Sequence, residues 1–426
     1  MEVKAGYKQT EVGVIPADWV VKPLYSIAEK IMVGIASAAT HAYKAKGVPM
    51  FRNQNIKVGG LDDSDLIFID PEYEAAFINK RLRGGDLLTM RTGYPGVTAI
   101  IPNQYEGAQS FTTLITRPKQ NEAESSYLCH LINSDFGQRF FTQSQIGGAQ
   151  KNVNAGTLRG MPIPLPSIPE QRAIATALSD IDTLLSGLDR LIAKKRDLKQ
   201  AAMQQLLTGQ TRLPGFEDEW EVKTLGDLGL TFGGLTGKSK ADFGEGQSYY
   251  VTFMNVMTNV VIDCSTFERV KVSSMESQNK VMKGDLLFNG SSETPEEVAM
   301  CAVLLADVPN LFLNSFCFGF RFYDGAEADG LFLAYYLRSK EGRELMKSLA
   351  QGSTRYNMSK TALLKSSFRL PTAPEQTAIA TVLSDMDAEL AALEARREKT
   401  RLLKQGMMQE LLTGKTRLIT PEPADA

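Results

Sequence analysis

The feature that most constrains this chain is a long internal repeat. The stretch "PEQRAIATALSDID", which begins at Pro169, returns as "PEQTAIATVLSDMD" at Pro374. The match runs without a gap from residues 165–213 to residues 370–418, and 29 of the 49 aligned positions are identical. A repeat of this length and identity indicates one structural unit used twice, so the fold must accommodate two copies of it.

Each copy has the sequence pattern of one long α-helix. Within each copy, prolines precede the predicted helix and a glycine follows it, at Gly209 and Gly414, as helix starts and stops require. Apolar residues recur at alternating spacings of four and three, which is the seam of a coiled coil. A helix over residues 170–207 would be about 57 Å long. We expect the two helices to pair along this seam, which comprises Ile174, Leu178, Ile181, Leu185, Leu188, Ile192, Ile379, Leu383, Met386, Leu390 and Leu393. The simpler alternative is that they are core helices of separate domains.

The two tryptophans extend the repeat beyond the helices. Trp19 and Trp220 both lie in the pattern W-x-V-K-x-L, the first near the start of the chain and the second just after the first helix. The order is therefore globule, helix, globule, helix. Because the start of the chain matches the segment that follows a helix, we expect the two chain ends to lie close together. The prediction is a circular arrangement of two equivalent halves about a pseudo-twofold axis.

The two globules share a few marks and otherwise differ. "RGGDLLTMR" at Arg83 corresponds to "MKGDLLFNG" at Met282, and each predicts a turn followed by a buried strand. Residues 125–140 and 330–345 each have the pattern of an amphipathic helix, and the segments that follow place Asn152 and Asn357 in register. The alternating residues Phe316, Phe318, Phe320 and Phe322 predict a strand with one aromatic face in the core. Short strands with a helix near the end of each globule predict an α+β fold.

Composition and motifs limit the function classes. The net charge is −2, so any nucleic-acid contact must rest on local clusters of positive charge or on a partner. No run approaches the roughly 20 apolar residues of a membrane helix, the start lacks the apolar core of a signal peptide, and the four cysteines form no C-x-x-C pair. These features predict a cytoplasmic protein. Metal-ligand spacings, a nucleophile elbow, a complete phosphate-binding loop and the adenine methyltransferase motif N-P-P-[YF] are all absent from the sequence, which predicts a chain without catalytic activity.

With these residues in view, the chain resembles the specificity subunits of type I restriction–modification enzymes. The resemblance rests on the doubled P-E-Q helix and is supported by the tryptophan motifs, the Gly-Asp-Leu-Leu strands and "GSTRYNMSKTAL" at Gly352. It covers essentially the whole chain. It implies target-recognition domains at 1–165 and 214–369, conserved spacer helices at 166–213 and 370–418, and a tail at 419–426.

The resemblance also implies a function. Each recognition domain would read one half of a bipartite, asymmetric target in double-stranded DNA, and the paired helices would fix the gap between the halves. Two methyltransferase subunits that bind S-adenosylmethionine would dock on this chain for adenine N6 methylation. Two further motor subunits that use ATP and Mg²⁺ would convert the complex into an endonuclease. The chain itself would hold no cofactor or metal and would supply specificity alone.

Direct readout of DNA requires Arg, Lys, Asn or Gln side chains on exposed loops. The candidates in the first globule are Arg81, Arg83, Arg91, Gln150, Lys151 and Asn152, and those in the second are Lys238, Lys240, Asn289, Arg355, Tyr356, Asn357 and Lys360. For each of them an ordinary solvated surface side chain is the competing interpretation.

Two function classes compete with the DNA-reading hypothesis. One is a stand-alone DNA methyltransferase or nuclease, which the absent methyltransferase motif disfavours. The other is a coiled-coil scaffold that binds only protein, for which two divergent globules on a repeated frame would be unusual. A third alternative, within the family, is an orphan or modification-only subunit.

Overall fold

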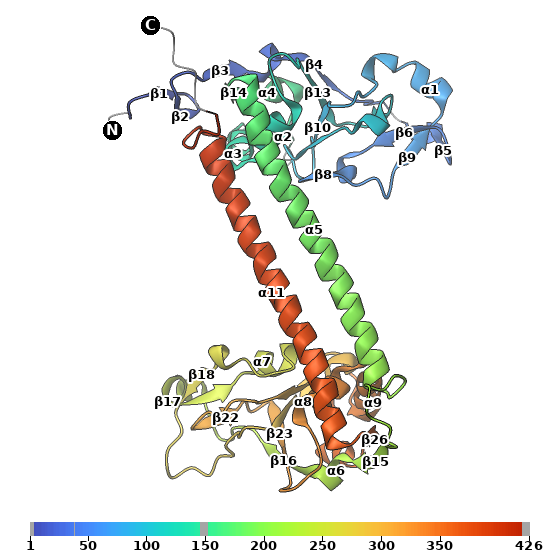
Figure 1. The fold of residues 1–426 in the computed structure, drawn as a ribbon, viewed down its shortest axis with the longest axis vertical. Coiled ribbons are helices and arrows are strands. Elements are labelled where there is room, and N and C mark those ends of the chain that lie inside the picture. The colour runs from blue at the N-terminus through green and yellow to red at the C-terminus, as the bar shows by residue number, and fades with distance from the viewer. Residues whose placement is uncertain (1–3, 38, 145–151, 420–426) are drawn as a thin grey trace. The chain divides into compact units, whose positions relative to one another are not determined.

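The computed structural model describes residues 4–37, 39–144 and 152–419. The chain divides into two compact units: unit 1 comprises Met1–Asp189 with Ala395–Ala426, and unit 2 comprises Arg190–Glu394. Each unit thus contains one globule, the first half of one long helix and the second half of the other (Figure 1). The boundary between the units falls within the long helices.

The two long helices are α5 (Ile168–Leu206) and α11 (Ala373–Leu411), each of 39 residues. The helix predicted over 170–207 is confirmed to within two residues at its start and one at its end. Gly209 and Gly414 follow the helices with φ of +73° and +69°, a left-handed conformation that ends a helix readily only at glycine.

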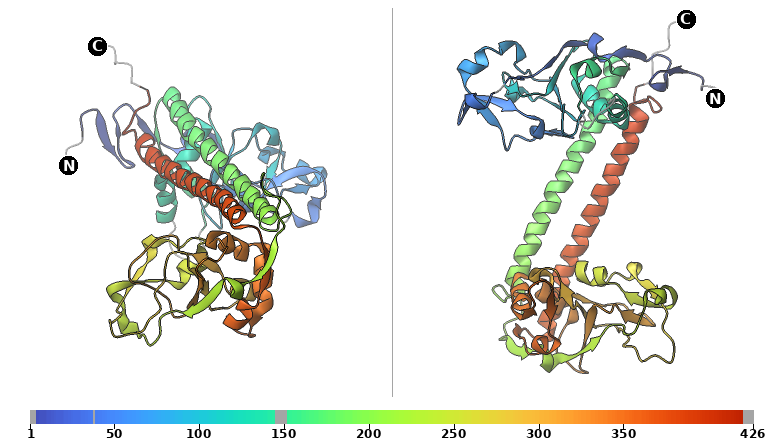
Figure 2. Two further views of the ribbon diagram at one scale, coloured as in Figure 1. Left: turned by 60° about the horizontal axis from the view of Figure 1, so that its bottom comes forward. Right: turned by 180° about the vertical axis from the view of Figure 1, so that it is seen from behind.

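The helices run antiparallel in both units. In unit 1 the ion pairs Asp182–Lys404 (2.6 Å) and Asp189–Arg397 (3.2 Å) join them, so the residue number falls on α11 as it rises on α5. In unit 2 Lys195–Glu389 (2.7 Å) and Lys199–Asp387 do the same. The two helices lie side by side in each unit (Figure 2). The seam residues are buried or half-buried, as pairing along this face requires.

Each globule is built on a four-stranded antiparallel sheet with the same strand order. In unit 1 the order is β11 (Thr98–Ile100), β10 (Leu87–Thr89), β13 (Leu114–Pro118) and β4 (Ala28–Val33). In unit 2 it is β21 (Cys301–Val303), β19 (Leu286–Asn289), β23 (Cys317–Phe322) and β16 (Gly229–Gly233). The strands predicted after the Gly-Asp turns are β10 and β19, and each is one of the two inner strands of its sheet.

A second sheet lies in each globule, and one strand pair in each is parallel. In unit 1 it comprises β12 (Gln109–Ser110), β6 (Val48–Phe51), β9 (Ile67–Ile69) and β5 (Tyr43–Lys44), with β12 and β6 parallel. In unit 2 it comprises β18 (Glu268–Val270), β17 (Phe243–Val251) and β22 (Leu311–Leu313), with β17 and β22 parallel.

The amphipathic helix predicted in each globule is in fact two helices. Unit 1 has α2 (Ser125–Asn133) and α3 (Asp135–Gln143), and unit 2 has α8 (Gly330–Arg338) and α9 (Lys340–Leu349). Ser134 and Ser339 separate them, and each accepts a hydrogen bond as the N-cap of the second helix. A Cβ at Gly137 or Gly342 would lie within 2.2 Å of a carbonyl oxygen of the preceding helix, so both turns require glycine.

The core of each globule includes the ends of both long helices. In unit 1 Ile174 and Leu178 of α5 pack with Leu411 at the end of α11, and in unit 2 Ile379 and Leu383 of α11 pack with Leu206 at the end of α5. All are less than 10% exposed. The helix ends are therefore fixed in the globule by apolar burial.

A repeated ionic contact joins the segment after each long helix to the start of the other. In unit 1 Arg417 binds the carboxylate of Glu170, and in unit 2 Arg212 binds Glu375, each through two hydrogen bonds of 2.5–2.8 Å. Each guanidinium also lies 5.8 Å from a tryptophan ring, Trp19 in unit 1 and Trp220 in unit 2. The N-terminal and C-terminal segments thus meet in unit 1, as predicted, and the α+β fold with two globules and two antiparallel helices is confirmed.

Candidate nucleic-acid interface

The Gly-Asp turn that precedes the central strand has the same structural role in both units. Asp86 accepts two hydrogen bonds of 2.7 and 2.8 Å from the guanidinium of Arg117, and Asp285 accepts 2.7 and 2.9 Å bonds from Arg321. Both aspartates are buried, and each carboxylate raises the pKa of the arginine that it binds. Arg83 lies in this turn: its backbone N–H donates to Asp86 and its side chain is exposed.

Arg81 is engaged within the protein. Its guanidinium donates hydrogen bonds of 2.7 and 2.8 Å to Glu74, whose side chain is 1% exposed, and this contact lowers the pKa of Glu74 and raises that of Arg81. The Arg81 side chain is still 46% exposed. A DNA contact by Arg81 would have to compete with a buried carboxylate.

Asn152 and Asn357 occupy the same place in the two units. The backbone N–H of Val153 donates to the carbonyl of Arg91 (3.0 Å), and that of Met358 donates to the carbonyl of Gly290 (3.0 Å). Asn152 and Asn357 precede these anchored residues and both are exposed. The register predicted from the sequence therefore places an exposed asparagine beside the end of the central strand in each unit. Gln150 and Lys151 lie outside the described residues.

Arg91 fills the place that Gly290 holds in unit 2. Its side chain is half-buried, and its Nε atom is buried without a hydrogen-bond partner among the residues that the structure describes. Its backbone N–H donates to Asn53 Oδ1 (3.3 Å), and Asn53 Nδ2 donates to Thr92 (3.1 Å). Three polar side chains thus converge at this end of the strand in unit 1.

In unit 2 the corresponding surface carries exposed cations beside aromatic rings. Arg355 lies 6.0 Å from the ring centroid of Phe316, and the Nζ atom of Lys360 lies 5.6 Å from that of Phe318. Arg355 and Lys360 are exposed, Tyr356 is half-buried in β25 (Tyr356–Met358), and Phe316 is 61% exposed. The candidates Arg355, Asn357 and Lys360 therefore lie together on the surface of this unit.

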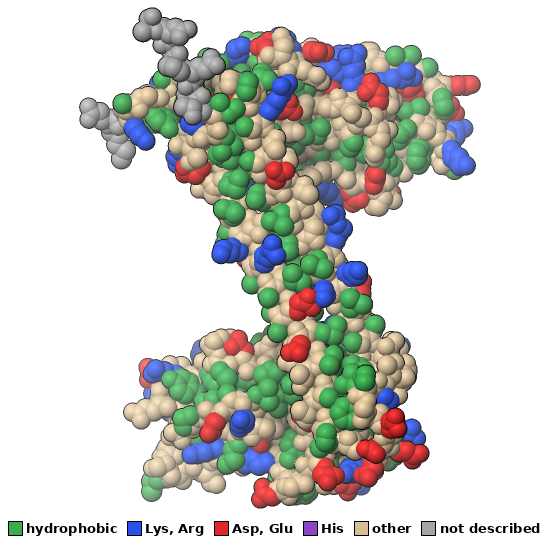
Figure 3. Space-filling model, viewed as in Figure 1, with side chains coloured by type: hydrophobic (Ala, Val, Ile, Leu, Met, Phe, Trp, Pro, Cys, Tyr) green, Lys and Arg blue, Asp and Glu red, His purple; other side chains and the backbone are tan. Residues whose placement is uncertain are grey.

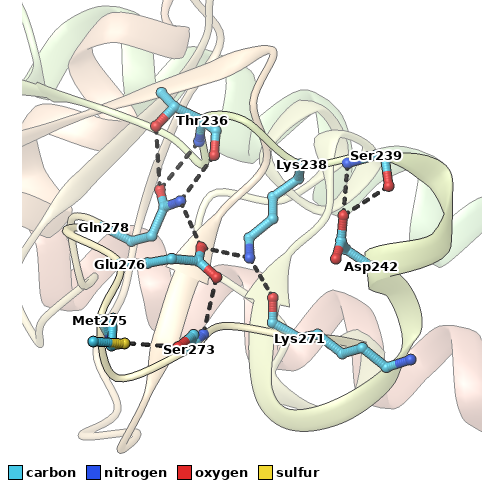
Figure 4. A network of polar contacts seen from close by, with 9 residues as sticks. All are labelled: Thr236, Lys238, Ser239, Asp242, Lys271, Ser273, Met275, Glu276 and Gln278. Carbon is cyan, nitrogen blue, oxygen red and sulfur yellow. Dashed lines mark hydrogen bonds and ion pairs between the residues drawn. The ribbon is translucent and has the colours of Figure 1, made fainter.

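Lys238 is held inside a polar network of unit 2 (Figure 4). Its Nζ atom contacts Glu276 and the carbonyl of Lys271, both at 2.5 Å, and its side chain is 5% exposed. The hydrogen bond from Lys238 is the main cause of the lowered pKa of Glu276, about 2. The ammonium of Lys238, one of the candidates for DNA contact, therefore faces into the protein, whereas Lys240 is exposed.

Asn289 is fully buried and its side-chain hydrogen bonds are satisfied within the protein. Its Nδ2 atom donates to the carbonyls of Ser291 (3.1 Å) and Glu297 (2.9 Å), and its Oδ1 atom accepts from the N–H of Met300 (2.6 Å). A contact between Asn289 and DNA would require these three bonds to break.

On one face of the molecule, charge is dispersed over both units (Figure 3). On the face shown in Figure 3, basic and acidic side chains are interspersed over each of them. Within the described ranges, no group of three or more His, Cys, Asp or Glu side chains could hold a metal ion. None of the described helices is long and apolar enough to cross a membrane.

Each unit has an open groove beside the paired helices. The groove of unit 2 measures about 1000 Å³ and lies between the second half of α5, the first half of α11 and the junction of α8 and α9. That of unit 1, about 510 Å³, lies between the second half of α11 and the junction of α2 and α3. Both are lined by the same five residue types at repeat-related positions: Arg196, Lys199, Gln200, Met203 and Gln204, and Arg401, Lys404, Gln405, Met408 and Gln409. The residues that line the globule side differ between the two grooves.

Two features of the structure were not predicted from the sequence. Phe316 was predicted to share the core face of Phe318 and Phe320, which are at most 2% exposed, yet Phe316 is largely exposed because it lies in the turn before β23. The pair Asp182–Lys404 and its counterpart Asp387–Lys199 were also missed, although all four residues are identical between the copies of the repeat. The identity of these polar residues between the two copies of the repeat could have indicated that they form an ion pair.

Comparison with known proteins bears on the family. The family model described as "Type I restriction modification DNA specificity domain" matches residues 16–194 and again residues 217–403. A putative type I restriction enzyme specificity subunit of Methanocaldococcus jannaschii is 28% identical, with 97% of each chain covered.

Two solved structures share the fold. The HsdS subunit of Thermoanaerobacter tengcongensis aligns with a TM-score of 0.51 at 19% identity, covering 94% of this chain and 98% of its own. The type I restriction–modification S subunit of M. genitalium aligns with a TM-score of 0.59 at 15% identity, covering 96% and 98%. The two family-model matches together span well over half of the sequence. The chain therefore belongs to the family of type I restriction–modification DNA specificity proteins and carries its specificity domain twice.

Proposed function

We propose that this chain is the DNA sequence-recognition subunit of a type I restriction–modification complex. The observation that carries the proposal is a repeated frame that holds two different surfaces. The central sheets, the Asp–Arg turns and the ionic contacts at the helix ends recur in both units. The side chains at the end of the central strand differ: Arg91 and Thr92 in one unit, Gly290 and Ser291 in the other. This suits a protein that reads two different half-sites.

The paired helices are proposed as the spacer between the two recognition domains, 1–165 and 214–369. Each helix is continuous over 39 residues, which is about 59 Å of α-helix. Equivalent faces of B-DNA recur every ~34 Å, so a stiff element of this length is on the scale needed to separate two half-sites. Because the two surfaces differ, the target is expected to be asymmetric.

Methyltransferase subunits are the proposed protein partners, two per chain. The two grooves support this stoichiometry, because one side of each is lined by identical residues at repeat-related positions. Two copies of one partner would find the same helix face twice. In this proposal S-adenosylmethionine binds the methyltransferase subunits, while ATP and Mg²⁺ bind two motor subunits that add endonuclease activity. The complex would act in the cytoplasm, where the DNA lies.

The chain is proposed to have no catalytic activity of its own, and its relatives are named as specificity subunits. Near-neutral charge is compatible with DNA binding if the partners provide part of the phosphate contact, which dominates affinity. The test is a titration of labelled duplexes with the purified complex of this chain and its methyltransferase subunits, at fixed salt. Specific retention of one bipartite sequence by the complex, and not by the methyltransferase subunits alone, is the expected result. Equal binding of both preparations would refute the proposal.

A further inference from the structure

Phe316 is held outward by the backbone around it. The turn before β23 is closed by a hydrogen bond from the N–H of Cys317 to the carbonyl of Asn314 (3.0 Å), and the N–H of Phe316 donates to the side chain of Asn314 (2.9 Å). The carbonyl of Phe316 accepts from the N–H of Gly290 (2.8 Å). This backbone holds the Phe316 ring at the surface of the unit, where the residue is 61% exposed.

The same surface presents cations without carboxylate partners. Arg355 and Lys360 form no ion pair with any residue that the structure describes, whereas Lys238, Arg321 and Lys347 in the same unit each do. Arg355 lies over the Phe316 ring, and Lys360 lies beside Phe318. Two unpaired cations beside an exposed aromatic ring are the side chains that contact phosphates and bases in nucleic-acid complexes.

Asn357 joins this group through the backbone. Ser291 and Asn357 face each other in the pairing of β20 (Ser291–Ser292) with β25, and the adjacent Gly290 bonds to both Phe316 and Met358. Gly290 makes this close approach possible, since a Cβ there would lie 2.9 Å from the Phe316 carbonyl oxygen. Phe316, Arg355, Asn357 and Lys360 thus form one surface, called here the Phe316 surface.

We infer that the Phe316 surface is where the second recognition domain contacts DNA, with the Phe316 ring against base atoms and Arg355 and Lys360 on the flanking phosphates. This inference rests on the proposed function and deepens it by assigning one half-site to named residues. An uncharged ring contributes to base contact without releasing counterions, whereas each cation on a phosphate does release them. The two kinds of contact therefore differ in their dependence on salt.

The experiment uses the complex of this chain with its methyltransferase subunits. The probes are a fluorescent duplex that contains the motif identified by methylation mapping and an unrelated duplex of the same length. Phe316→Ala is expected to weaken binding to the motif about tenfold while leaving the slope of log Kd against log salt unchanged. Arg355→Ala is expected to weaken binding and to reduce that slope by about one.

Matched variants distinguish a base contact from a general effect of losing an aromatic ring. Phe316→Trp keeps a ring and should bind within about threefold of the wild type, because aromatic stacking tolerates a change of ring. Phe316→Gln, a second variant that keeps a long side chain below Arg355, should lose as much as Phe316→Ala. Tyr323→Ala removes another exposed ring, 49% exposed just after the other end of β23, and should have no effect.

The outcomes separate the inference from the proposed function. If the wild-type complex prefers the motif but Phe316→Ala and Phe316→Gln bind it equally well, the Phe316 surface is not the contact and the inference is overturned. Equal losses for Tyr323→Ala and Phe316→Ala would also overturn it. A wild-type complex that does not distinguish the two duplexes would instead refute the proposed function.

Discussion

The guanidinium of Arg417 donates hydrogen bonds of 2.5 and 2.8 Å to the carboxylate of Glu170, which lies 247 residues earlier in the chain. The same guanidinium donates to Asp18 at 2.7 and 2.9 Å. One side chain near the C-terminus thus contacts both the N-terminal segment and the first turn of α5. In the equivalent contact of unit 2, Arg212 lies just after α5 and binds Glu375 in the first turn of α11. The same arginine–glutamate contact therefore recurs in both units, and in unit 1 the arginine also joins the N-terminal and C-terminal segments of the chain.

Removal of Glu170 should destabilise unit 1. Glu170 has a side chain 2% exposed, and its loss leaves Arg417 without its buried partner. Breaking such a pair by removing one member costs about 3–5 kcal/mol. We expect Glu170→Gln to lower the free energy of unfolding by an amount near the lower end of this range, since Asp18 still binds Arg417. Urea denaturation followed by circular dichroism measures the change, and an unaltered midpoint would contradict the structural role.

The two tryptophans provide a matched test of one hydrogen bond. Trp19 Nε1 donates to Glu170 Oε2 (3.2 Å), whereas Trp220 Nε1 is buried with no partner among the described residues. Both lie near an arginine at the same distance. Replacement by Phe removes the same atoms in both cases, so Trp19→Phe should cost about 1 kcal/mol more than Trp220→Phe. Equal free energies of unfolding for the two variants would show that the Trp19 bond contributes nothing.

His130 should make unit 1 sensitive to acid. Burial lowers the pKa of His130 to about 4, and its Nε2 atom lies 3.1 Å from Ser179 Oγ. In the unfolded chain the histidine takes up a proton near its usual pKa of about 6.5. The contribution of neutral His130 to the stability of the folded state is therefore fully present above a pH of about 6.5. This contribution is lost as the pH falls from about 6.5 towards 4.

The residue at the equivalent place in unit 2 is a tyrosine, so this acid sensitivity belongs to unit 1. Tyr335 donates to Asp387 (2.7 Å), just as His130 lies near Asp182, and tyrosine does not titrate in this window. We expect a loss of up to about 3 kcal/mol between pH 7 and 4 from His130 in the wild type. In His130→Gln this part of the pH dependence should be absent. An identical pH profile of urea denaturation for both proteins would exclude His130 as its source.

Asn289 and Asn357 should respond in opposite ways to the same substitution. Asn289 is buried with three hydrogen bonds, so Asn289→Ala leaves unpaired backbone groups and should lower the free energy of unfolding by about 1–3 kcal/mol. Asn357 is exposed, and among the described residues its Nδ2 atom donates only to the carbonyl of Arg355 (3.2 Å), so Asn357→Ala should leave stability unchanged and weaken DNA binding. Thermal unfolding and duplex titration of the two variants measure both effects. A stable Asn289→Ala variant with weakened DNA binding would reverse our assignment of the two asparagines.

The architecture was accessible from the sequence because its determinants are local or repeated. The seam from Ile174 to Ile192 defines a helix and its buried face, and the second copy of the repeat defines its partner. The match between the segments around Trp19 and Trp220 predicted that the chain ends meet. The breaks at Ser134 and Ser339 were missed, because the apolar pattern continues across both turns and only Ser-x-x-Gly marks them.

The candidate interface was harder to predict from the sequence, because its geometry depends on residues that are far apart in the chain. Lys238 faces inward because Glu276 lies opposite it, 38 residues later, and no local pattern predicts that pair. Asn289 resembles a loop residue in the sequence but bonds to Glu297 and Met300. Phe316 continues the alternation of a buried strand, yet the turn at Asn314 places it before β23 and outside the core. Residue type predicted the chemistry of the surface, whereas exposure required the tertiary structure.

We propose that this chain selects a bipartite DNA sequence for adenine methylation. The most direct measurement is long-read detection of N6-methyladenine across the source genome, with the gene present and with it deleted. We expect methylation at one split, asymmetric motif to disappear on deletion and to return when the gene is restored. If the parent cells express this chain and its methyltransferase subunits, and methylation is unchanged at every motif after deletion, then this chain does not direct adenine methylation.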